Sequence, residues 1–498
     1  MRGGPLVVIG DTLLDVDIDG AAERLAPDSP VPVVDCRRER HRAGGAGLAA
    51  VLAAGLASSR VTLVTALGDD KPGERLRDIL GRHVETVYVP LRGSTPCKIR
   101  VRASGQSLVR LDAGDGRAAP RPAGVAAIER IMREAGAILV SDYGRGMTAL
   151  PWLAAMLGRL PGEIPVVWDP HPAGRQPLPG VRLVTPSRAE ARTFAVALDS
   201  AAPGNAVRAG APAVRQAARD ATSLACAWGA AVAVTMGEHG AVLSTGDTAP
   251  FVAPAARLAP GQAADACGAG DCFAAAAVQA LRGGGLLTEA LVEAVSRASQ
   301  FVAQGGAAAA PGRTIPAAPA ARPAAVRPPG HAPSDVISGI RARGGTIVAT
   351  GGCFDLLHAG HVSLLRHARR LGDCLVVCLN SDSSVRALKG PGRPLVGAAD
   401  RERVLMALEY VDAVITFDQL TPSAVLEQLR PDVWVKGGDY ASTELAEGAV
   451  VRRYGGEVVL LPYAERQSTS RIVAAARGLA DQCASPRESS FTVSKGHG

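Results

Sequence analysis

The chain has 498 residues and a formal net charge of +7 at pH 7, and at about 100 to 200 residues per domain this length predicts two or three units rather than one core. The positive charge is spread through an arginine-rich chain without a basic block interleaved with aromatics, which indicates anionic ligands rather than a nucleic-acid-binding module. Nine cysteines, an odd number without framework spacing, predict free thiols in a reducing cytoplasm. No run approaches the roughly 20 apolar residues of a membrane span, so neither export nor membrane insertion is expected.

Buried strands alternate with alanine-rich helical stretches in both halves of the chain. Short apolar and β-branched runs lie at 137–140, 165–168 and 375–379. This rhythm predicts an α/β fold class, with parallel sheets covered by helices on both faces. Residues 14–18 and 99–111 alternate polar and apolar side chains, so we expect exposed antiparallel strands there.

A glycine-rich turn at 265–271, DACGAGD, precedes an alanine-rich helical stretch. Glycines leave backbone N–H groups bare at a helix start, where the helix dipole favours anions, and Asp271 stands in the first turn. A carboxylate there can take a proton from a hydroxyl, while the N–H groups of Gly268, Ala269 and Gly270 hold a phosphoryl group. A glycine turn before an Asp-capped helix is also a common structural element, so the surrounding motifs decide between the two.

A proline- and alanine-rich segment separates the two halves. Residues 316–334 lack a periodic apolar face, which predicts a semi-rigid, solvated linker. We expect domains at 1–315 and 335–480. The polar, serine-bearing tail at 481–498 has no face to bury and is predicted to be disordered.

The second half opens with a predicted strand, a tight glycine turn and a helix start at residues 350–361, TGGCFDLLHAGH. Backbone N–H groups and the imidazoles of His358 and His361 converge where a helix dipole favours anions, which predicts a phosphate site. Two surface histidines, or half of a zinc site, are the alternatives. Zinc needs further ligands, and the nearby Cys374 and Cys378 lie inside a predicted buried strand.

Two lysines and a hydroxyl cluster follow in the second half. The chain has only five lysines, and Lys389 and Lys436 each precede a glycine here. A compact ammonium suits a triphosphate, although a solvated surface lysine would look the same. The hydroxyls at 468–470 predict the N-cap of the last helix, which either holds a phosphate or simply caps the helix.

The run 350–361 resembles the G-x-F-D-x-x-H-x-G-H signature of the nucleotidyltransferase superfamily that includes the cytidylyltransferases and adenylyltransferases. In that superfamily a substrate phosphate attacks the α-phosphate of a nucleoside triphosphate, and the enzyme contributes positioning and charge stabilisation. The resemblance implies a Rossmann-like domain in which His358, His361 and Lys436 are catalytic. It also implies these nucleotide-binding residues: Gly351, Cys353, Phe354, Asp355, Lys389, Arg401, Gly437, Asp439, Ser468, Thr469 and Ser470.

Residues 5–315 resemble the ribokinase-like sugar kinases. The motifs that carry this resemblance are the Gly-Asp pair at 10–11, the glycine pair at 44–45, Ser-Asp-Tyr at 141–143, P-x-x-x-E at 186–190, TMGEHG at 235–240 and the turn at 265–271. Residues 24–34, 98–100 and 108–112 resemble more closely the heptose kinase half of the bifunctional enzymes of ADP-heptose synthesis. Those enzymes carry an adenylyltransferase half in the same order.

The kinase resemblance implies a three-layer α/β/α domain with a small β lid, which in that family often forms a homodimer contact. Asp271 would be the general base, and Gly268, Ala269 and Gly270 the anion hole. The sugar-binding positions would be Asp11, Gly44, Gly45, Lys98 and Arg110. The ATP-binding positions would be Ser187, Glu190, Thr235, Gly237 and Gly240, with Glu190 organising the water shell of Mg²⁺. The structural alternatives are turn formation for Asp11 and the glycines, and a solvated helix position for Glu190.

Four positions depart from the family pattern. Leu48 stands where a sugar-facing asparagine is usual, Cys267 replaces a threonine of the anion loop, Ser187 replaces an asparagine, and His171 stands where lysine is common. None of them removes the base or the anion hole. Losing an amide at Leu48 leaves the identity of the sugar more open than the kinase chemistry.

The two resemblances together imply a bifunctional enzyme. One half would phosphorylate C1 of a heptose 7-phosphate, and the other would join a heptose 1-phosphate to AMP, both with ATP and Mg²⁺ and without a tightly bound cofactor. A separate phosphatase must act between them, because the kinase product carries two phosphates. The alternatives are another sugar or nucleotide, a single active half with the kinase as a scaffold, and a nucleic-acid-binding protein.

Overall fold

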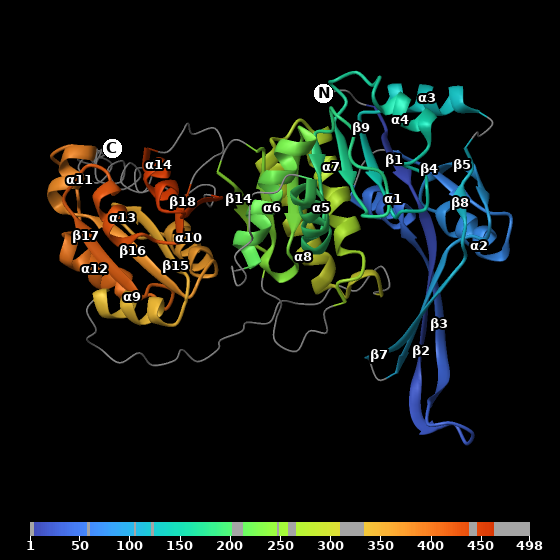
Figure 1. Ribbon diagram of the computed structural model, residues 1–498, viewed down its shortest axis with the longest axis horizontal. Coiled ribbons are helices and arrows are strands. Elements are labelled where there is room, and N and C mark those ends of the chain that lie inside the picture. The colour runs from blue at the N-terminus through green and yellow to red at the C-terminus, as the bar shows by residue number, and fades with distance from the viewer. Residues whose placement is uncertain are drawn as a thin grey trace, which may run out of the picture. The chain divides into compact units, whose positions relative to one another are not determined.

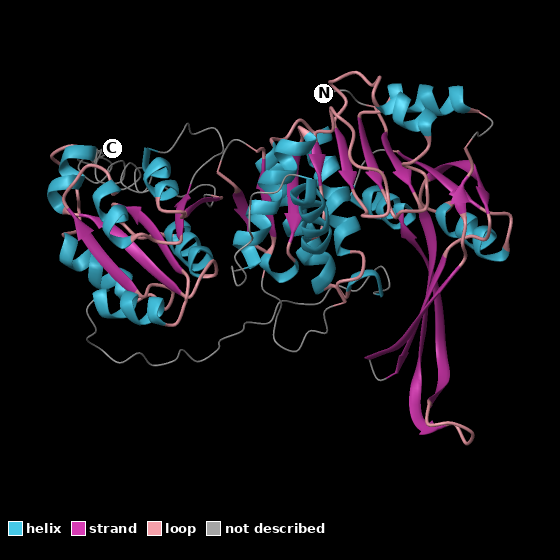
Figure 2. Ribbon diagram, viewed as in Figure 1, coloured by secondary structure: helices cyan, strands magenta, loops and turns pink. Residues whose placement is uncertain are grey.

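The computed structural model describes residues 4–56, 60–103, 106–120, 124–201, 213–246, 249–256, 265–308, 333–437 and 446–462. The chain forms two compact units, residues 1–325 and 326–498, and each contains a sheet flanked by helices (Figures 1 and 2). In the described ranges no helix is long and apolar enough to cross a membrane. The predicted tail and most of the predicted linker lie outside these ranges, and the domain bounds stay a prediction.

The central sheet of the first unit contains mostly parallel strands. These are β1 (Leu6–Gly10), β4 (Val61–Leu67), β5 (Glu85–Arg92), β8 (Arg117–Ala118), β9 (Ala137–Ser141), β10 (Val166–Asp169), β11 (Leu183–Val184), β12 (Ala231–Thr235), β13 (Ala241–Ser244) and β14 (Phe251–Ala253). Their order is β14-β13-β12-β11-β10-β9-β1-β4-β5-β8. The strands from β12 to β5 pair in parallel, and β13, β14 and β8 are antiparallel additions at the edges. The predicted strands at 137–140 and 165–168 are confirmed, and both belong to the parallel part.

The helices of the first unit flank this sheet. They are α1 (Ala46–Leu56), α2 (Lys71–Leu80), α3 (Val125–Arg133), α4 (Pro151–Leu157), α5 (Arg188–Ala201), α6 (Ala213–Trp228), α7 (Ala269–Arg282) and α8 (Leu287–Ala303), with short 3₁₀ turns η1 (Gly237–His239) and η2 (Gly306–Ala308). Helix α7 packs between α1 and α8, and α5 packs on α6. Every residue of β1 and β9 is buried, which accounts for their unbroken apolar sequences.

A second, four-stranded sheet extends from this unit as a lid (Figure 1). Its strands are β2 (Thr12–Leu25), β3 (Pro32–Gly45), β6 (Cys97–Ala103) and β7 (Gln106–Ala113), in the order β3-β2-β6-β7. The expectation of exposed antiparallel strands is confirmed for β7, which is exposed and runs antiparallel to β6, and for residues 14–18 it is wrong in two respects. Strand β2 runs parallel to β6, and residues 14–17 of β2 are buried where it packs on α1 and α2. Alternation of polar and apolar residues does not determine strand direction, which here follows from the long connection between β2 and β6.

The second unit has a wholly parallel sheet of order β17-β16-β15-β18-β19. Its strands are β15 (Ile347–Gly352), β16 (Cys374–Asn380), β17 (Ala413–Phe417), β18 (Val433–Gly437) and β19 (Glu457–Leu461). Its helices are α9 (Pro333–Ala342), α10 (Ala359–Arg369), α11 (Asp382–Lys389), α12 (Ala398–Met406), α13 (Ser423–Leu429) and α14 (Ala446–Arg453). The expected buried strand at 375–379 is confirmed.

Both sheets reverse their strand order at one point, which is where ligands bind in folds of this class. In the first unit the chain winds outward from β1 toward β4 on one side and from β9 toward β10 on the other, so the reversal lies between β1 and β9. In the second unit it lies between β15 and β18. The residues that follow these four strands at their carboxyl ends are therefore the candidates for chemistry.

Candidate active sites

Asp271 lies in the first turn of α7 with its side chain buried, as the sequence predicted. Its Oδ1 accepts a hydrogen bond of 2.9 Å from the hydroxyl of Tyr143, which follows β9. Burial raises the pKa of Asp271 to about 7, and the Tyr143 hydroxyl opposes this by stabilising the carboxylate. A carboxylate with a pKa near neutrality is well matched to accept a proton from a sugar hydroxyl.

The glycine turn before Asp271 is locked by its neighbours. Gly268 caps α7 in the left-handed region, with φ +80°, and a Cβ on it would lie 2.7 Å from Cδ2 of Leu48. The N–H of Ala269 donates to the carbonyl of Ala266 at 3.1 Å. Leu48 therefore packs directly against the glycine turn, so the departure at position 48 places an apolar side chain beside this predicted anion loop.

The lid holds the anion loop through arginines that the sequence analysis did not select. Arg102 in β6 pairs with Asp265 at 3.1 Å, and Arg42 in β3 lies 3.7 Å from the sulfur of Cys267. Asp265 also accepts the N–H of Cys267 at 3.0 Å. Arg42 precedes the Gly44–Gly45 pair by two residues, and this proximity is the one signal that could have identified it.

Two further carboxylates of the lid balance these arginines. Asp15 is paired with Arg100 at 2.7 Å and with Arg42 at 3.2 Å, while Asp17 is paired with Arg42 at 2.9 Å. All four side chains are largely buried at the base of the lid. The formal charges of these four side chains cancel. Because the side chains come from β2, β3 and β6, their ion pairs fix these strands of the lid relative to one another.

Asp11 lies at the reversal point between β1 and β9. Its carboxylate accepts the N–H groups of Tyr143 at 3.1 Å, Arg145 at 2.8 Å and Met147 at 3.0 Å. Burial raises its pKa, and these hydrogen bonds work in the opposite direction. The carboxylate of Asp11 therefore organises the turn at 143–147, and its predicted sugar-binding role stays a prediction.

The predicted glycine pair lies beside these carboxylates. A Cβ on Gly44 would lie 2.5 Å from Oδ2 of Asp15. Gly45 has φ +62°, and a Cβ on it would lie 2.5 Å from the carbonyl of Asp11. Both positions therefore require glycine for close approach, and Gly45 also for its backbone conformation.

Of the two cations predicted to bind sugar, only Lys98 is placed near Asp271. Its Nζ lies 5.5 Å from the centroid of the Tyr143 ring, and its charge acts to lower the pKa of Asp271. Arg110 instead lies on the exposed strand β7 and pairs with Asp112 at 3.0 Å. The structure does not bring Arg110 to the other predicted sugar residues.

The predicted ATP-binding residues meet at the carboxyl ends of strands β11 and β12 of the first sheet. Ser187 and Thr235 form a parallel β-bridge, and Gly237 and Gly240 follow with φ +59° and +87°. Glu190 accepts the N–H of Ser187 at 2.8 Å and donates its own N–H to the Ser187 hydroxyl at 3.3 Å, which is a capping box for α5. One oxygen of Glu190 is therefore used in capping the helix, and the charge of this carboxylate still acts on the half-buried Asp169.

In the second unit His358 and His361 lie together at the start of α10. His358 is the N-cap residue, and the two rings stack with centroids 3.9 Å apart. Burial lowers the pKa of His358, and burial with the neighbouring His358 charge lowers that of His361 to about 4. Both imidazoles are therefore neutral near pH 7. Both ring nitrogens of His358 and Nδ1 of His361 are buried without a hydrogen-bond partner, which is typical of groups that await a ligand.

The expected tight glycine turn before these histidines is wrong. Gly351 and Gly352 are the last residues of β15, and the residue with positive φ is Phe354, at +44°. A Cβ on Gly351 would lie 2.6 Å from the ring of Trp434, and one on Gly352 would lie 3.2 Å from the ring of Phe354. The glycines are required by close packing, and the turn occurs two residues later.

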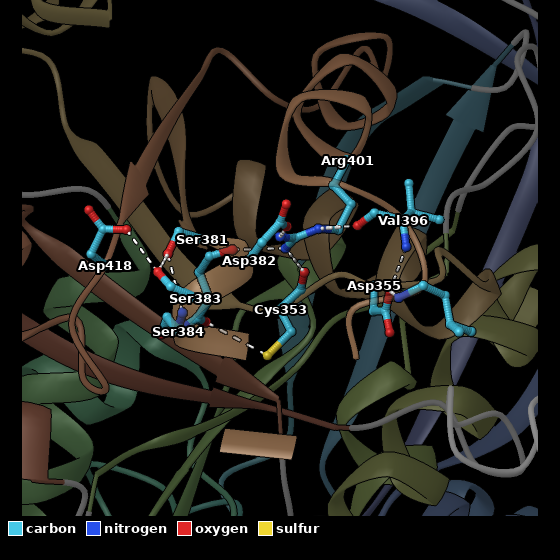
Figure 3. A network of polar contacts seen from close by, with 11 residues as sticks. Cys353, Asp355, Ser381, Asp382, Ser383, Ser384, Val396, Arg401 and Asp418 are labelled. Carbon is cyan, nitrogen blue, oxygen red and sulfur yellow. Dashed lines mark hydrogen bonds and ion pairs between the residues drawn. The ribbon is translucent and has the colours of Figure 1, made fainter. Parts of the chain in front are cut away.

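Arg401 is fully buried and holds three segments together (Figure 3). Its guanidinium donates to the carbonyls of Cys353, Asn380 and Val396 at 2.5, 2.9 and 2.9 Å and to the carboxylate of Asp382 at 2.7 Å. Cys353 follows β15, Asn380 ends β16, and Val396 precedes α12. Arg401 therefore organises the loops at the carboxyl edge of the sheet through backbone contacts.

Asp355 and Cys353, two predicted nucleotide-binding residues, join the same arrangement. Asp355 accepts the side chain of Arg393 and the N–H groups of Leu395 at 2.6 Å and Val396 at 3.2 Å. Burial alone would raise the pKa of Asp355, but these hydrogen bonds outweigh it and lower the pKa. The Sγ of Cys353 points to Oδ1 of Asn380 at 3.9 Å. Arg393 was not selected from the sequence.

Lys436 and Gly437 end β18, beside β15 at the reversal point. Lys436 is half-buried and pairs with Glu447 of α14 at 3.1 Å, a contact that the sequence did not indicate. Lys389 is exposed at the end of α11, and its charge contributes to lowering the pKa of His361. The predicted residues Asp439, Ser468, Thr469 and Ser470 lie outside the described residues.

The zinc alternative finds no support in the described residues. They contain no group of three or more His, Cys, Asp or Glu side chains that could hold a metal ion. Cys374 and Cys378 are buried in β16, and all eight described cysteines are free thiols. Free cysteines agree with the expectation from their odd number.

Comparison with known proteins assigns both halves to families. Residues 5–313 match the pfkB family carbohydrate kinases, and residues 349–475 match the cytidylyltransferase-like family. The chain is thus a bifunctional enzyme, a ribokinase-like sugar kinase followed by a Rossmann-like nucleotidyltransferase.

Its relatives align with nearly the whole chain, across both halves. The chain is 50% identical to the "Bifunctional protein HldE" of Streptomyces coelicolor, over 95% of this chain and 97% of that protein. It is 37% identical to the protein of the same name from Azorhizobium caulinodans, over 95% and 98%. The chain belongs to the family of bifunctional HldE proteins.

Proposed function

We propose that the chain catalyses two steps of ADP-heptose synthesis. The first half transfers the γ-phosphoryl group of ATP to the C1 hydroxyl of D-glycero-D-manno-heptose 7-phosphate, giving the 1,7-bisphosphate and ADP. The second half transfers AMP from ATP to heptose 1-phosphate, giving ADP-heptose and pyrophosphate. Membership of the HldE family, with both catalytic motifs on one chain, supports this assignment.

The kinase step rests on one observation above all, the buried carboxylate of Asp271 at the glycine turn that begins α7, with the Tyr143 hydroxyl hydrogen-bonded to it. Asp271 removes the proton of the C1 hydroxyl as the sugar oxygen attacks the γ-phosphorus and ADP leaves. The N–H groups of the turn at 268–270 stabilise the charge on the transferred phosphoryl group. Lys98 at the base of the lid faces the sugar phosphate.

The nucleotidyl transfer needs no covalent intermediate. An oxygen of the sugar phosphate attacks the α-phosphorus of ATP, and pyrophosphate leaves. His358 and His361 donate hydrogen bonds as neutral imidazoles to the phosphates, and Lys436 stabilises the charge that develops. Arg401, Asp355 and Cys353 act indirectly, by fixing the loops that present these groups.

Magnesium enters both sites with ATP. Mg²⁺ is usually bound through substrate phosphates and waters rather than by an all-protein cage, so we propose a metal carried by the nucleotide. Glu190 keeps one carboxylate oxygen outside its capping box and would face the waters of that ion. Bound Mg²⁺ neutralises phosphate charge, and no further cofactor is required.

Further features follow from this chemistry. The bisphosphate must lose its C7 phosphate before the second step, so a separate phosphatase acts in between.

Strand β7 is the exposed edge of the lid, with Leu108, Val109 and Leu111 exposed by 43, 45 and 50%, and we place the contact of a homodimer there. ATP and sugar phosphates as substrates place the enzyme in the cytoplasm, without nucleic-acid or membrane partners.

The deciding experiment incubates the pure protein with ATP, Mg²⁺ and a panel of heptose and hexose phosphates, with mass analysis of the products. We expect a bisphosphate from heptose 7-phosphate and ADP-heptose from heptose 1-phosphate. Exclusive turnover of another sugar, or of GTP or CTP in the second step, would replace the substrate assignment. The apolar side chain of Leu48 beside the anion loop is the observation that favours the alternative of another sugar substrate.

A further inference from the structure

Tyr143 links the two carboxylates of the kinase site. Its hydroxyl donates to Oδ1 of Asp271 at 2.9 Å, and its backbone N–H donates to Oδ2 of Asp11 at 3.1 Å. We propose that Tyr143 is a positioning residue for phosphoryl transfer, whose hydroxyl holds Oδ1 of Asp271 and leaves Oδ2 to accept the proton of the sugar hydroxyl. The proposal rests on the proposed role of Asp271 as the base.

The ring of Tyr143 is fixed from two sides. A Cβ on Gly45 would lie 3.3 Å from Cδ2 of Tyr143, so the ring packs against a glycine that has no side chain. The Lys98 ammonium lies 5.5 Å from the ring centroid, within the range of a cation–π contact. The hydrogen bond from the backbone N–H of Tyr143 to Asp11 fixes the main chain of the same residue. A hydroxyl carried by so constrained a ring holds its hydrogen-bond partner in one orientation.

The hydroxyl also acts on the charge of the base. Burial raises the pKa of Asp271, whereas the hydrogen bond from Tyr143 lowers it by favouring the carboxylate. Burial and the nearby charge of Asp271 raise the pKa of Tyr143 well above its ordinary value, so the phenol keeps its proton and remains a donor. The other charged groups that face Asp271 are Asp15, Asp169, Lys98 and Arg42.

Tyr143→Phe tests the proposal, because it removes the hydroxyl and keeps the ring. Because the hydroxyl is a donor to a charged group, we expect kinase kcat to fall by roughly tenfold or more without it. The acid limb of kinase kcat/KM should move upward by about one pH unit, because the carboxylate loses a stabilising donor. The KM for ATP should stay unchanged, and the transferase activity of the same chain serves as an internal control.

Tyr88→Phe is the matched control. The Tyr88 oxygen also takes part in a hydrogen bond, with the Thr86 hydroxyl at 2.8 Å, but it lies on β5 away from Asp271. We expect this variant to keep the kinase pH profile of the wild type. A ring-fluorinated tyrosine at position 143 provides the opposite change, because a more acidic phenol donates more strongly and should move the acid limb downward without altering the packing.

The possible results separate the tyrosine from the base. If Asp271→Asn abolishes kinase turnover while neither change at Tyr143 moves the acid limb, the base stands and the positioning role is overturned. If Tyr143→Phe lowers only the melting temperature, the tyrosine is a packing residue and the proposal is again overturned. If Asp271→Asn keeps kinase turnover, the proposed base itself is wrong. Should Tyr143→Phe fail to fold, the fluorinated protein gives the same decision through the direction of its shift.

Discussion

Lys436 of β18 and Glu447 of α14 form an ion pair, with Nζ and Oε1 3.1 Å apart. Their side chains are 29% and 11% exposed, and the ammonium also lies 5.9 Å from the centroid of the Trp434 ring. The lysine at the reversal point of the second sheet is therefore held in place from outside its own strand. A preorganised ammonium stabilises developing charge more than a mobile one does.

Replacing either member of this pair should affect nucleotidyl transfer alone. Lys436→Ala should lower its kcat by about 10²-fold, the scale for loss of one preorganised donor. Glu447→Gln should lower kcat less, and it should lower the KM for ATP, because a negative charge near the triphosphate is removed. Glu427→Gln is the control, since Glu427 pairs with Arg453 on the surface of the same unit. Unchanged kcat and KM in Glu447→Gln would show that the pair has no part in the reaction.

The two histidines give a second prediction for the same half. His358→Ala and His361→Ala should each reduce nucleotidyl transfer by about 10²-fold, mainly in kcat, because the imidazoles are proposed to bind the expanding phosphorus centre more strongly than ground-state ATP. Kinase turnover in the same chain should not change. Because burial lowers the pKa of His361 to about 4, protonation of this imidazole should not reduce the transfer rate between pH 8 and 6. Stoichiometric zinc in the wild type, lost with either histidine, would instead support a metal site.

Asp271→Asn should abolish the kinase step and leave nucleotidyl transfer intact. A missing general base lowers the rate by roughly 10²- to 10⁴-fold. In the wild type the kinase rate should rise with pH and level off above about 7, because the carboxylate must be ionised to accept a proton. Steady-state rates of both reactions between pH 5 and 9 measure this. Kinase turnover within about threefold of wild type in the variant would remove Asp271 from this role.

The same carboxylate predicts a pH dependence of stability. The pKa of Asp271 is about 7 in the folded chain and near 3.8 when exposed. Folded protein therefore retains a proton that the unfolded chain releases, so the free energy of unfolding falls as pH rises from about 4 to about 7, by about 1.4 kcal/mol per unit. Asp271→Asn lacks this effect. Denaturant titrations should show the variant more stable than wild type at pH 8, with the difference vanishing near pH 4, and a constant difference would contradict the raised pKa.

Arg401→Met should destabilise the second unit rather than impair phosphate binding alone. The change removes the donor of three backbone carbonyls and of the partly exposed Asp382, and a buried acceptor left unsatisfied costs about 1–3 kcal/mol. Arg403→Met is the control, since Arg403 is 81% exposed on the same helix. Melting curves of the two variants, with transferase rates below the transition, distinguish the effects. If Arg401→Met keeps the melting temperature of the wild type but loses transferase activity, Arg401 contacts the phosphates of the nucleotide directly.

The sequence predicted the parts of this fold that depend on local pattern. Continuous apolar runs identified β9, β10 and β16, and the glycine turn identified the start of α7 with Asp271 in its first turn. The buried strands are visible as continuous apolar runs, and the helix start depends on interactions within a few residues, so a single sequence is enough to predict both.

Contacts between distant segments were not predictable in the same way. The parallel pairing of β2 with β6 depends on how the chain returns to the lid. The pairs Tyr143–Asp271 and Lys436–Glu447 each join different elements, and a single sequence gives no signal for them. Gly351 was expected in a turn, whereas its close packing against Trp434 exists only once β15 and β18 are adjacent.

The final prediction concerns the two halves of the chain. Cutting between Pro319 and Pro329, within the proline- and alanine-rich segment, should give two soluble fragments that each retain one activity, because few contacts are expected to cross such a boundary. Each half also contains its own sheet and its own reversal point with the residues proposed for its chemistry. Size-exclusion chromatography and separate rate assays on the fragments measure this, with the uncut protein as the reference. Fragments that are inactive alone and recover activity only when mixed would show that the halves share a core and that the proposed boundary is wrong.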